Sequence, residues 1–96
     1  MTQFTHVVKR SGAIVPFNQE RISNAIYRAA VAVGGRDRER AVWLAGQVVQ
    51  LLEQKLPAEH APHIEEIQDA VEKVLIENGH AVVAKVYILY RSFRYT

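Results

Sequence analysis

Residues 4–17 read FTHVVKRSGAIVPF and lead directly into Asn18 and a helical pattern, and this order decides the fold. Two short apolar runs, Val7-Val8 and Ile14-Val15, flank the turn sequence Arg10-Ser11-Gly12 and predict a β-hairpin. Gly12 suits the turn because glycine adopts positive φ at little steric cost. Two isolated strands are only marginally stable in water, so this hairpin must pack on helices.

Four stretches with apolar residues at spacings of three and four follow the hairpin, and each predicts an amphipathic helix. Asn18 and Asp37 are good N-caps for the first two helices, which Gly34-Gly35 and Pro57 end. The predicted fold class is α+β, in which a small β-hairpin cap packs on a four-helix bundle. We expect the cap over residues 4–17 and helices over 19–33, 38–56, 63–78 and 80–94.

The last predicted helix is apolar nearly all round, since Lys85 and Arg91 are the only charges between residues 81 and 93. Its β-branched run also suits a strand, but its length and the lack of strict alternation favour a helix. Such a helix is central in a bundle or buried against another domain or subunit. Its aromatic residues Tyr87, Tyr90 and Phe93 therefore either fill the core or form an interface.

The composition describes one compact domain over residues 1–96, with 49% hydrophobic and 23% charged residues. The absence of cysteine excludes disulfides, thiol nucleophiles, zinc ribbons and iron–sulfur sites, and fits an intracellular protein. No apolar run approaches the roughly 18 residues of a membrane span, and the N-terminus lacks the features of a signal peptide. We therefore expect a cytoplasmic protein without a membrane partner.

The charge is unevenly spread, although the formal net charge is only +2. Residues 1–40 carry seven basic and three acidic side chains, residues 41–80 two and seven, and residues 81–96 three and none. If the fold brings the two basic ends together, they form a positive surface suited to a small polyanion. The alternative is solvated charge on helix faces. The acidic middle argues against a continuous basic stripe for nucleic acid.

No arrangement of residues points to catalysis or to a metal site. The histidines lack metal-ligand spacing on any predicted helix, and His60 and His63 are best explained as exposed loop residues. The carboxylates of the third helix are typical of a solvated face, and the serines lack a His/Asp arrangement. We predict no catalytic residues and no metal ligands.

Positive charge does gather where the hairpin meets the first helix. Lys9 and Arg10 precede the turn glycine, and Arg21 lies in the first turn of a helix whose N-terminus favours anions. The alternative is that Lys9 and Arg10 only protect an exposed strand edge. Three apolar residues nearby can form a slot for a flat ring, although the two isoleucines also have core spacing: Val8, Ile22 and Ile26.

Four blocks, in order, resemble the ATP-cone family over almost the whole chain. They are VKRSG at 8–12, FNxxRI at 17–22, IEEIQDAVE at 64–72 and AKxYIxYR at 84–91. The resemblance implies a hairpin cap, often with a third short strand, over four helices. It also implies a pocket for ATP or dATP with Mg²⁺.

The resemblance further implies a role for each matching residue. Val8 and Asn18 would lie at the adenine edge, with Ile22 and Ile26 on the ring. The phosphates would meet Lys9, Arg10 and Arg21, and further contacts would come from Gln68 and Arg91. Two positions depart from the family pattern, since Ser11 replaces the common Asp and Val15 stands where several reductase cones carry an acid. These departures bear on ribose and magnesium contacts and on ATP against dATP discrimination.

In function, the resemblance implies the N-terminal overall-activity domain of a ribonucleotide reductase, which supplies deoxyribonucleotides for DNA replication. In that family, ATP permits activity and dATP suppresses it by changing subunit assembly, so the implied partners are adenine nucleotides, the rest of the reductase or its other subunit, and a second copy. Without cysteine the chain is neither a complete reductase nor a zinc-ribbon repressor, so we expect a regulatory segment that is not an enzyme by itself. The alternatives are a stand-alone or repressor-derived ATP-cone, and a vestigial cone that serves as a protein-interaction bundle.

Overall fold

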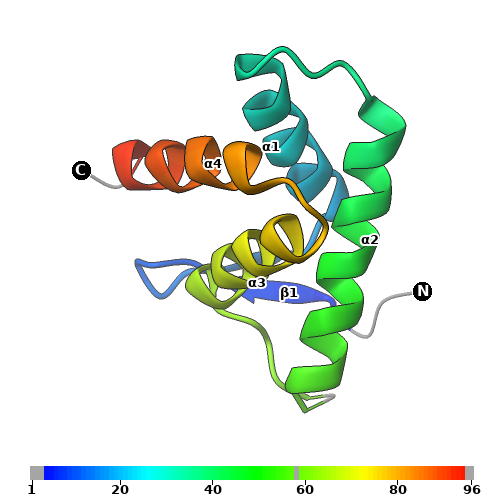
Figure 1. The fold of residues 1–96 in the computed structure, drawn as a ribbon. Helices are drawn as coiled ribbons and strands as arrows, with labels where there is room; N and C mark the ends of the chain where they lie inside the picture. The colour runs from blue at the N-terminus through cyan, green and yellow to red at the C-terminus, as the bar shows by residue number, and fades with distance from the viewer. Residues whose placement is uncertain (1–3, 58, 95–96) are drawn as a thin grey trace.

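The computed structural model describes residues 4–57 and 59–94, without the side chains of residues 92–94, so the expectation for Phe93 lies outside the described side chains. The fold is α+β, as predicted, with a two-stranded hairpin and four helices (Figure 1). Each helix begins and ends within one residue of its expected range. The elements are β1 (His6–Val8), β2 (Ile14–Pro16), α1 (Gln19–Ala32), α2 (Arg38–Lys55), α3 (Ile64–Glu77) and α4 (Ala81–Arg94).

The hairpin is antiparallel, with Val7 opposite Val15. Its turn is closed by two backbone hydrogen bonds, from Lys9 N–H to Ala13 O at 2.8 Å and from Gly12 N–H to Lys9 O at 2.9 Å. Gly12 has φ +91°, the left-handed conformation for which glycine is suited. The turn chemistry expected at this glycine is therefore present.

The third short strand implied by the family resemblance is reduced to a single contact in the described residues. Val8 N–H donates to Pro62 O at 3.0 Å, and Val8 forms an isolated parallel bridge with His63. This contact ties the hairpin to the loop that leads into α3. The sheet itself remains two-stranded.

The predicted N-caps are observed. The side chain of Asn18 accepts a hydrogen bond from Glu20 N–H at 2.9 Å, and that of Asp37 accepts one from Arg40 N–H at 2.9 Å. Each satisfies an amide that lacks a partner in the first turn of its helix. At the other end of α1, Gly34 follows with φ +91° and ends the helix.

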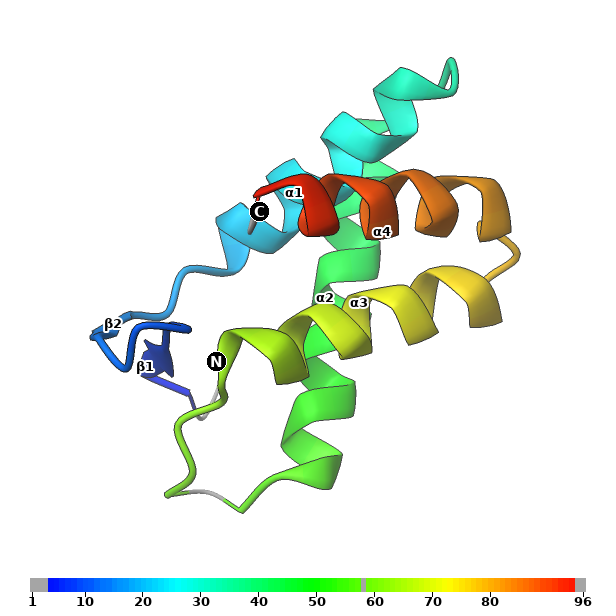
Figure 2. The same ribbon diagram turned by 90° about the vertical axis from the view of Figure 1, so that its left-hand side faces the viewer.

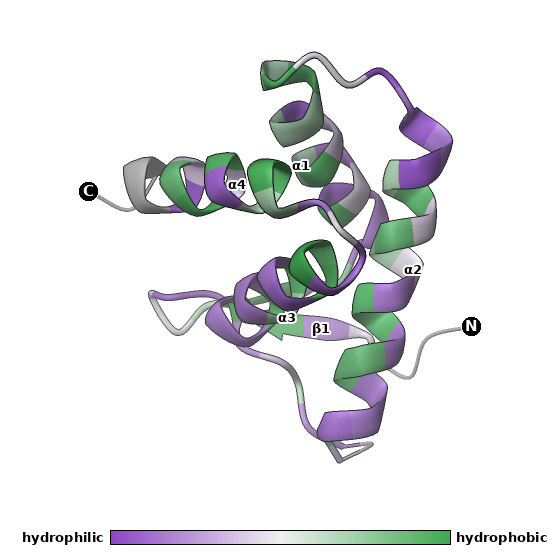
Figure 3. Ribbon diagram, in the orientation of Figure 1, coloured by the Kyte–Doolittle hydropathy of each residue, from purple (hydrophilic) through white to green (hydrophobic). Residues whose placement is uncertain are grey.

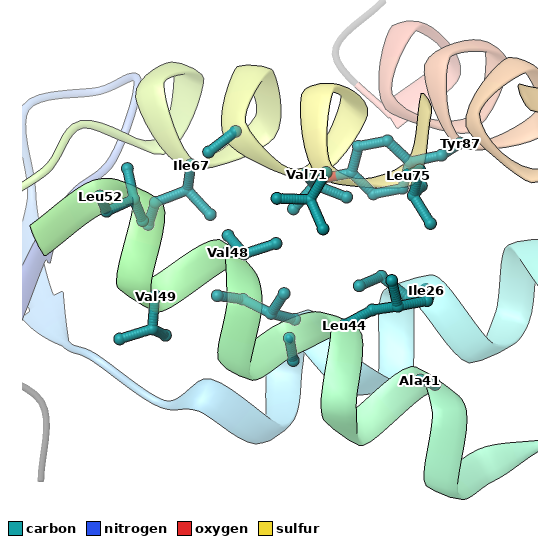
Figure 4. Packing of buried hydrophobic residues seen from close by; sticks show 14 of the residues in the cluster. Ile26, Ala41, Leu44, Val48, Val49, Leu52, Ile67, Val71, Leu75 and Tyr87 are labelled. Atoms are coloured by element: carbon teal, nitrogen blue, oxygen red, sulfur yellow. The ribbon is translucent and has the colours of Figure 1, made fainter. Parts of the chain in front are cut away.

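The helices form a ring of neighbours in which α1 and α3 each contact both α2 and α4 (Figures 1 and 2). Figure 4 shows apolar side chains of α2 and α3 meeting along their shared face, with Ile26 of α1 and Tyr87 of α4 at the same core. Ile26 is only 1% exposed. The core therefore lies inside the bundle, and of residues 4–9 before the turn only Phe4 and Val7 belong to it.

The fourth helix has two different faces. Ala84 and Tyr87 are buried against the bundle, whereas four large residues are exposed, namely Val82, Ile88, Leu89 and Tyr90. Figure 3 shows hydrophobic segments of α4 interrupted by hydrophilic ones on the visible side. Of the two predicted uses for its aromatic residues, Tyr87 fills the core and Tyr90 remains at the surface. Among the described residues, no helix is long and apolar enough to span a membrane.

Candidate functional site

A cavity of about 530 Å³ lies between the hairpin, the beginnings of α1 and α3, and the second half of α4. Figure 2 shows how the hairpin sits beside the first turns of α1 and α3. This volume falls in the range of roughly 300–1,000 Å³ typical of small-molecule sites. Four separate chain segments build the walls, so the cavity exists only in the folded domain.

Seven of the nine residues predicted to contact a nucleotide line this one cavity. They are Lys9, Arg10, Asn18, Arg21, Ile22, Gln68 and Arg91. Their roles toward a ligand stay a prediction, but the fold brings together residues that lie up to 82 positions apart, from Lys9 to Arg91.

The other two predicted residues, Val8 and Ile26, do not line the cavity. Successive side chains of a strand point to opposite faces, and Val7 is the one that faces the cavity. Val8 is half-buried and is the strand residue bound to the loop before α3. Ile26 lies one turn beyond Ile22 but is directed into the bundle core, where it is fully buried.

The cavity wall is strongly cationic. Its charged residues are all basic and come from the hairpin, α1 and α4, namely Lys9, Arg10, Arg21, Arg28 and Arg91. Within residues 4–57 and 59–94, no carboxylate is among the residues that line it. Arg28 was missed from the sequence, although it follows Arg21 by seven positions, which is about two helical turns and therefore the same face.

Two of these arginines have acidic partners on α3, outside the cavity lining. Arg10 Nε lies 3.6 Å from Glu65 Oε1, and both side chains are half exposed. Arg91 Nη1 donates to Asp69 Oδ1 at 3.0 Å and also to Glu72 Oε2. Burial lowers the pKa of Arg91, but its hydrogen bonds to the two carboxylates and their negative charge outweigh burial and raise the pKa above its usual value.

Apolar and amide side chains form the rest of the wall. Ile22 and Ala25 of α1 face Ile64 and Ile67 of α3 across the cavity, and Gln68 places a buried amide beside them. Further lining comes from residues that were not predicted as contacts: Ser11, Pro16 and Phe17 around the hairpin, and Tyr87 and Tyr90 of α4. An amide can both donate and accept hydrogen bonds, so the wall offers apolar contact and polar recognition together.

The loop before α3, to which the hairpin is hydrogen-bonded, is itself held by a carboxylate of α3. Glu66 accepts a hydrogen bond from the backbone N–H of His63 at 2.8 Å and contacts His60 Nε2 at 3.0 Å. Burial raises the pKa of Glu66, but the hydrogen bonds from His60 and His63 and their charge outweigh it and lower the pKa. The ionised carboxylate thus fixes the segment to which Val8 is bonded.

His60 and His63, which lie three residues apart in the sequence, do not form a metal site with Glu66. Their ring centroids are 6.2 Å apart, and in residues 4–57 and 59–94 no three His, Asp or Glu side chains gather in a way that could hold a metal ion. The described lining of the cavity consists of basic, apolar, aromatic, hydroxyl and amide side chains.

The family model of the ATP cone domain matches residues 5–96. Among curated proteins, the chain is 43% identical over 93 residues to a vitamin B12-dependent ribonucleoside-diphosphate reductase of Thermoplasma acidophilum, with 92% of this chain and 12% of that protein covered. It is 39% identical over 89 residues to an anaerobic ribonucleoside-triphosphate reductase of Salmonella typhimurium, covering 93% of this chain and 12% of the reductase.

A third relative is the ribonucleoside-diphosphate reductase subunit alpha of Chlamydia trachomatis, 38% identical over 100 residues, with 96% of this chain and 10% of that subunit covered. The chain thus spans about a tenth of the length of the reductases it matches. A region of this size is not the catalytic body of such a protein, so the chain is not an enzyme by itself.

Proposed function

The chain belongs to the ATP-cone domain family, and on that premise we propose that the cationic cavity binds ATP or dATP as an allosteric effector. The observation that carries the proposal is the composition of the wall: five basic side chains, no lining carboxylate, and apolar residues from facing helices in one cavity. A nucleoside triphosphate combines a polyanion with a flat apolar ring, and this wall is complementary to both parts.

The phosphates are assigned to the basic part of the wall. Lys9, Arg10 and Arg21 come from the hairpin and the first turn of α1, where the exposed amides of the helix terminus also favour anions. Arginine is suited to phosphate because its planar fork can donate two parallel hydrogen bonds. Arg28 and Arg91 extend the positive charge along the cavity.

The base is assigned to the slot between α1 and α3. Ile22 and Ala25 offer apolar contact on one side and Ile67 on the other, which suits the faces of a purine. Asn18 and Gln68 provide amide groups that can pair with the ring nitrogens and the amino group of adenine. Guanine reverses part of that donor and acceptor pattern, so we expect GTP to bind more weakly.

Magnesium does not fit a protein-held site in this cavity. Mg²⁺ prefers oxygen ligands and is usually held by one or two carboxylates together with substrate phosphates. Among the described residues that line the cavity there is no carboxylate, and Val15 stands on the wall, where the family resemblance implies an acid in several members. Mg²⁺ would therefore arrive on the triphosphate and be held by it and by water.

At the level of the whole protein, we propose that the domain regulates a cytoplasmic ribonucleotide reductase to which it is attached and so controls deoxyribonucleotide synthesis for DNA replication. The three reductases described above each contain a matching region of about a tenth of their length. The regulatory output would be a change in self-association. The exposed apolar residues of α4, including Ile88 and Leu89, provide a surface for it next to Tyr90 and Arg91 of the cavity.

Calorimetric titration with ATP, dATP and GTP, with and without Mg²⁺, tests the binding proposal. A ligand at one hundred times its Kd stabilises the folded state by about 2.7 kcal/mol. For a domain of this size that corresponds to a rise in melting temperature on the order of 10 °C. A melting curve that does not move in millimolar ATP or dATP would overturn the proposal and favour a vestigial cone.

Sedimentation velocity across protein concentrations tests the output. We expect different oligomer sizes with ATP and dATP, since an effector shifts assembly only through its different affinity for the two assembly states. Leu89→Gln should abolish this difference and leave the nucleotide affinity of the monomer unchanged, because Leu89 is exposed and does not line the cavity. One monomeric profile under all conditions would rule out switching by the domain alone.

A further inference from the structure

Arg91, the basic residue that α4 contributes to the described cavity lining, is hydrogen-bonded to acidic side chains of α3. Arg91 Nη1 donates to both Asp69 and Glu72, which lie three residues apart and therefore on the same face of α3. The Arg91 and Glu72 side chains are 20% and 21% exposed, whereas Asp69 is 72% exposed. The contact with Glu72 is thus the more buried of the two ion pairs.

A phosphate and a carboxylate are chemically similar acceptors for a guanidinium. Arg91 donates from the same nitrogen, Nη1, to both acidic residues. A phosphate that approaches Nη1 must therefore displace at least one of them. The two carboxylates also place negative charge beside the site, which repels a polyphosphate, and this repulsion acts most strongly where water is excluded.

We propose that Glu72 and Asp69 form a carboxylate latch that competes with the phosphates of the effector for Arg91 and sets the affinity of the site. This inference rests on the proposed function, because it concerns the anion-binding half of the same cavity. The latch holds α4 to α3 while the cavity is empty, and the incoming phosphates release it.

The latch has a second consequence for the empty domain. Removing one partner of a partly buried ion pair leaves the other charge poorly compensated, so loss of Glu72 destabilises the empty fold. The same change frees Arg91 for phosphate. Glu72→Gln should therefore lower the melting temperature without ligand and raise the ligand affinity. If Glu72 merely oriented Arg91 toward phosphate, the substitution would lower both the melting temperature and the ligand affinity.

The test measures the affinity of ATP and of inorganic tripolyphosphate by calorimetry for the wild type, Glu72→Gln and Asp69→Asn. We expect about five- to tenfold tighter binding of both ligands by Glu72→Gln, and about twofold by the more exposed Asp69→Asn. Glu77→Gln is the matched control, since it removes one charge at the exposed end of α3, away from the cavity. It should leave both affinities unchanged.

Unchanged or weaker binding by Glu72→Gln and Asp69→Asn overturns the latch. If Glu72→Gln does not fold, Asp69→Asn decides alone, because its exposed carboxylate contributes little to stability. Tripolyphosphate separates this inference from the proposed function. If tripolyphosphate binds and ATP does not, the proposed function is overturned, but the latch can still be measured with tripolyphosphate. If no variant binds either anion, both proposals are overturned.

Discussion

The hairpin and the helix bundle contribute differently to this domain. In the bundle, Val48 and Leu75 are completely buried between α2 and α3. In the hairpin, each strand has three residues, and Ile14 is 67% exposed. The hairpin is instead held by a few contacts, including the Val8–Pro62 hydrogen bond and the edge-to-face pair of Phe4 and Phe17.

This difference separates stability from binding. The bundle buries the apolar surface that drives folding. The hairpin contributes little burial, but it carries Lys9 and Arg10 to the cavity. Binding residues at the joint, where the hairpin meets the helix bundle, can therefore be changed without unfolding the domain. A ligand that contacts both the hairpin and the bundle stabilises this joint.

The largest effect is expected in the bundle. Leu75→Ala should destabilise the fold by about 2–5 kcal/mol, because it leaves a cavity in a fully buried site. Its neighbour Ile76 is 55% exposed, and Ile76→Ala should change stability by no more than about 0.5 kcal/mol. Urea unfolding measures both. Similar losses for the two variants would contradict the assignment of the core to the shared face of α2 and α3.

Substitutions at the joint should affect binding rather than folding. Lys9→Ala and Arg21→Ala should each weaken ATP or dATP binding by about 1.5–3 kcal/mol, since each removes a charge-assisted hydrogen bond to phosphate. Arg36→Ala is the control, because Arg36 is exposed between α1 and α2 and does not line the cavity. Calorimetry measures the affinities, and circular dichroism the folding.

Equal affinity in the wild type and both variants would refute the phosphate assignment. An equal loss for Arg36→Ala would instead indicate that only the overall charge matters, and the loss would then disappear at high salt.

In the turn of the hairpin, Gly12→Ala should cost about 1 kcal/mol, because φ is +91° there and an L residue is strained. Space is not the cause, since a Cβ at this position meets nothing within 4 Å. The matched control is Gly46→Ala inside α2, where a Cβ would make only an ordinary contact with Gln19 Nε2 at 3.9 Å.

That control should stabilise the protein by up to about 1 kcal/mol, since alanine favours helix more than glycine does. Thermal unfolding of both variants shows whether each substitution stabilises or destabilises the protein. A destabilising Gly46→Ala or a neutral Gly12→Ala would show that the two backbones differ from the conformations described.

The smallest effect concerns the support of the hairpin by Glu66. Its pKa is lowered in the folded state, so its contribution to stability is complete above about pH 4.5, where an ordinary glutamate titrates. That contribution is lost as the pH falls through the lower folded pKa. Because the side chain is 36% exposed, we expect the contribution to remain below about 1 kcal/mol.

Urea unfolding of the wild type and Glu66→Gln between pH 3 and 7 (roughly the range over which carboxylates titrate) measures this contribution. The two proteins should differ at neutral pH and converge in acid. The exposed Glu77→Gln serves as the control and should follow the wild type. A constant difference across the whole range would mean that the ionised form of Glu66 is not the stabilising one.

The helices, their caps and the hairpin could be predicted from the sequence because the features that cause them are local. Apolar spacing, the side chains of Asn18 and Asp37, and the glycines in the hairpin turn and after α1 each act within a few residues of the chain, so they predict helices, caps and the hairpin. The same locality predicted most of the basic residues of the cavity, since Lys9, Arg10 and Arg21 lie close together along the chain.

What the tertiary structure decided is how these elements face one another. Val7 rather than Val8 points into the cavity, and the rotation of α1 directs Ile26 into the bundle core. The pairing of Arg91 with Asp69 and Glu72 joins two helices across a loop. Helix rotation and helix contacts depend on how all side chains pack together, and no local pattern in the chain records that outcome.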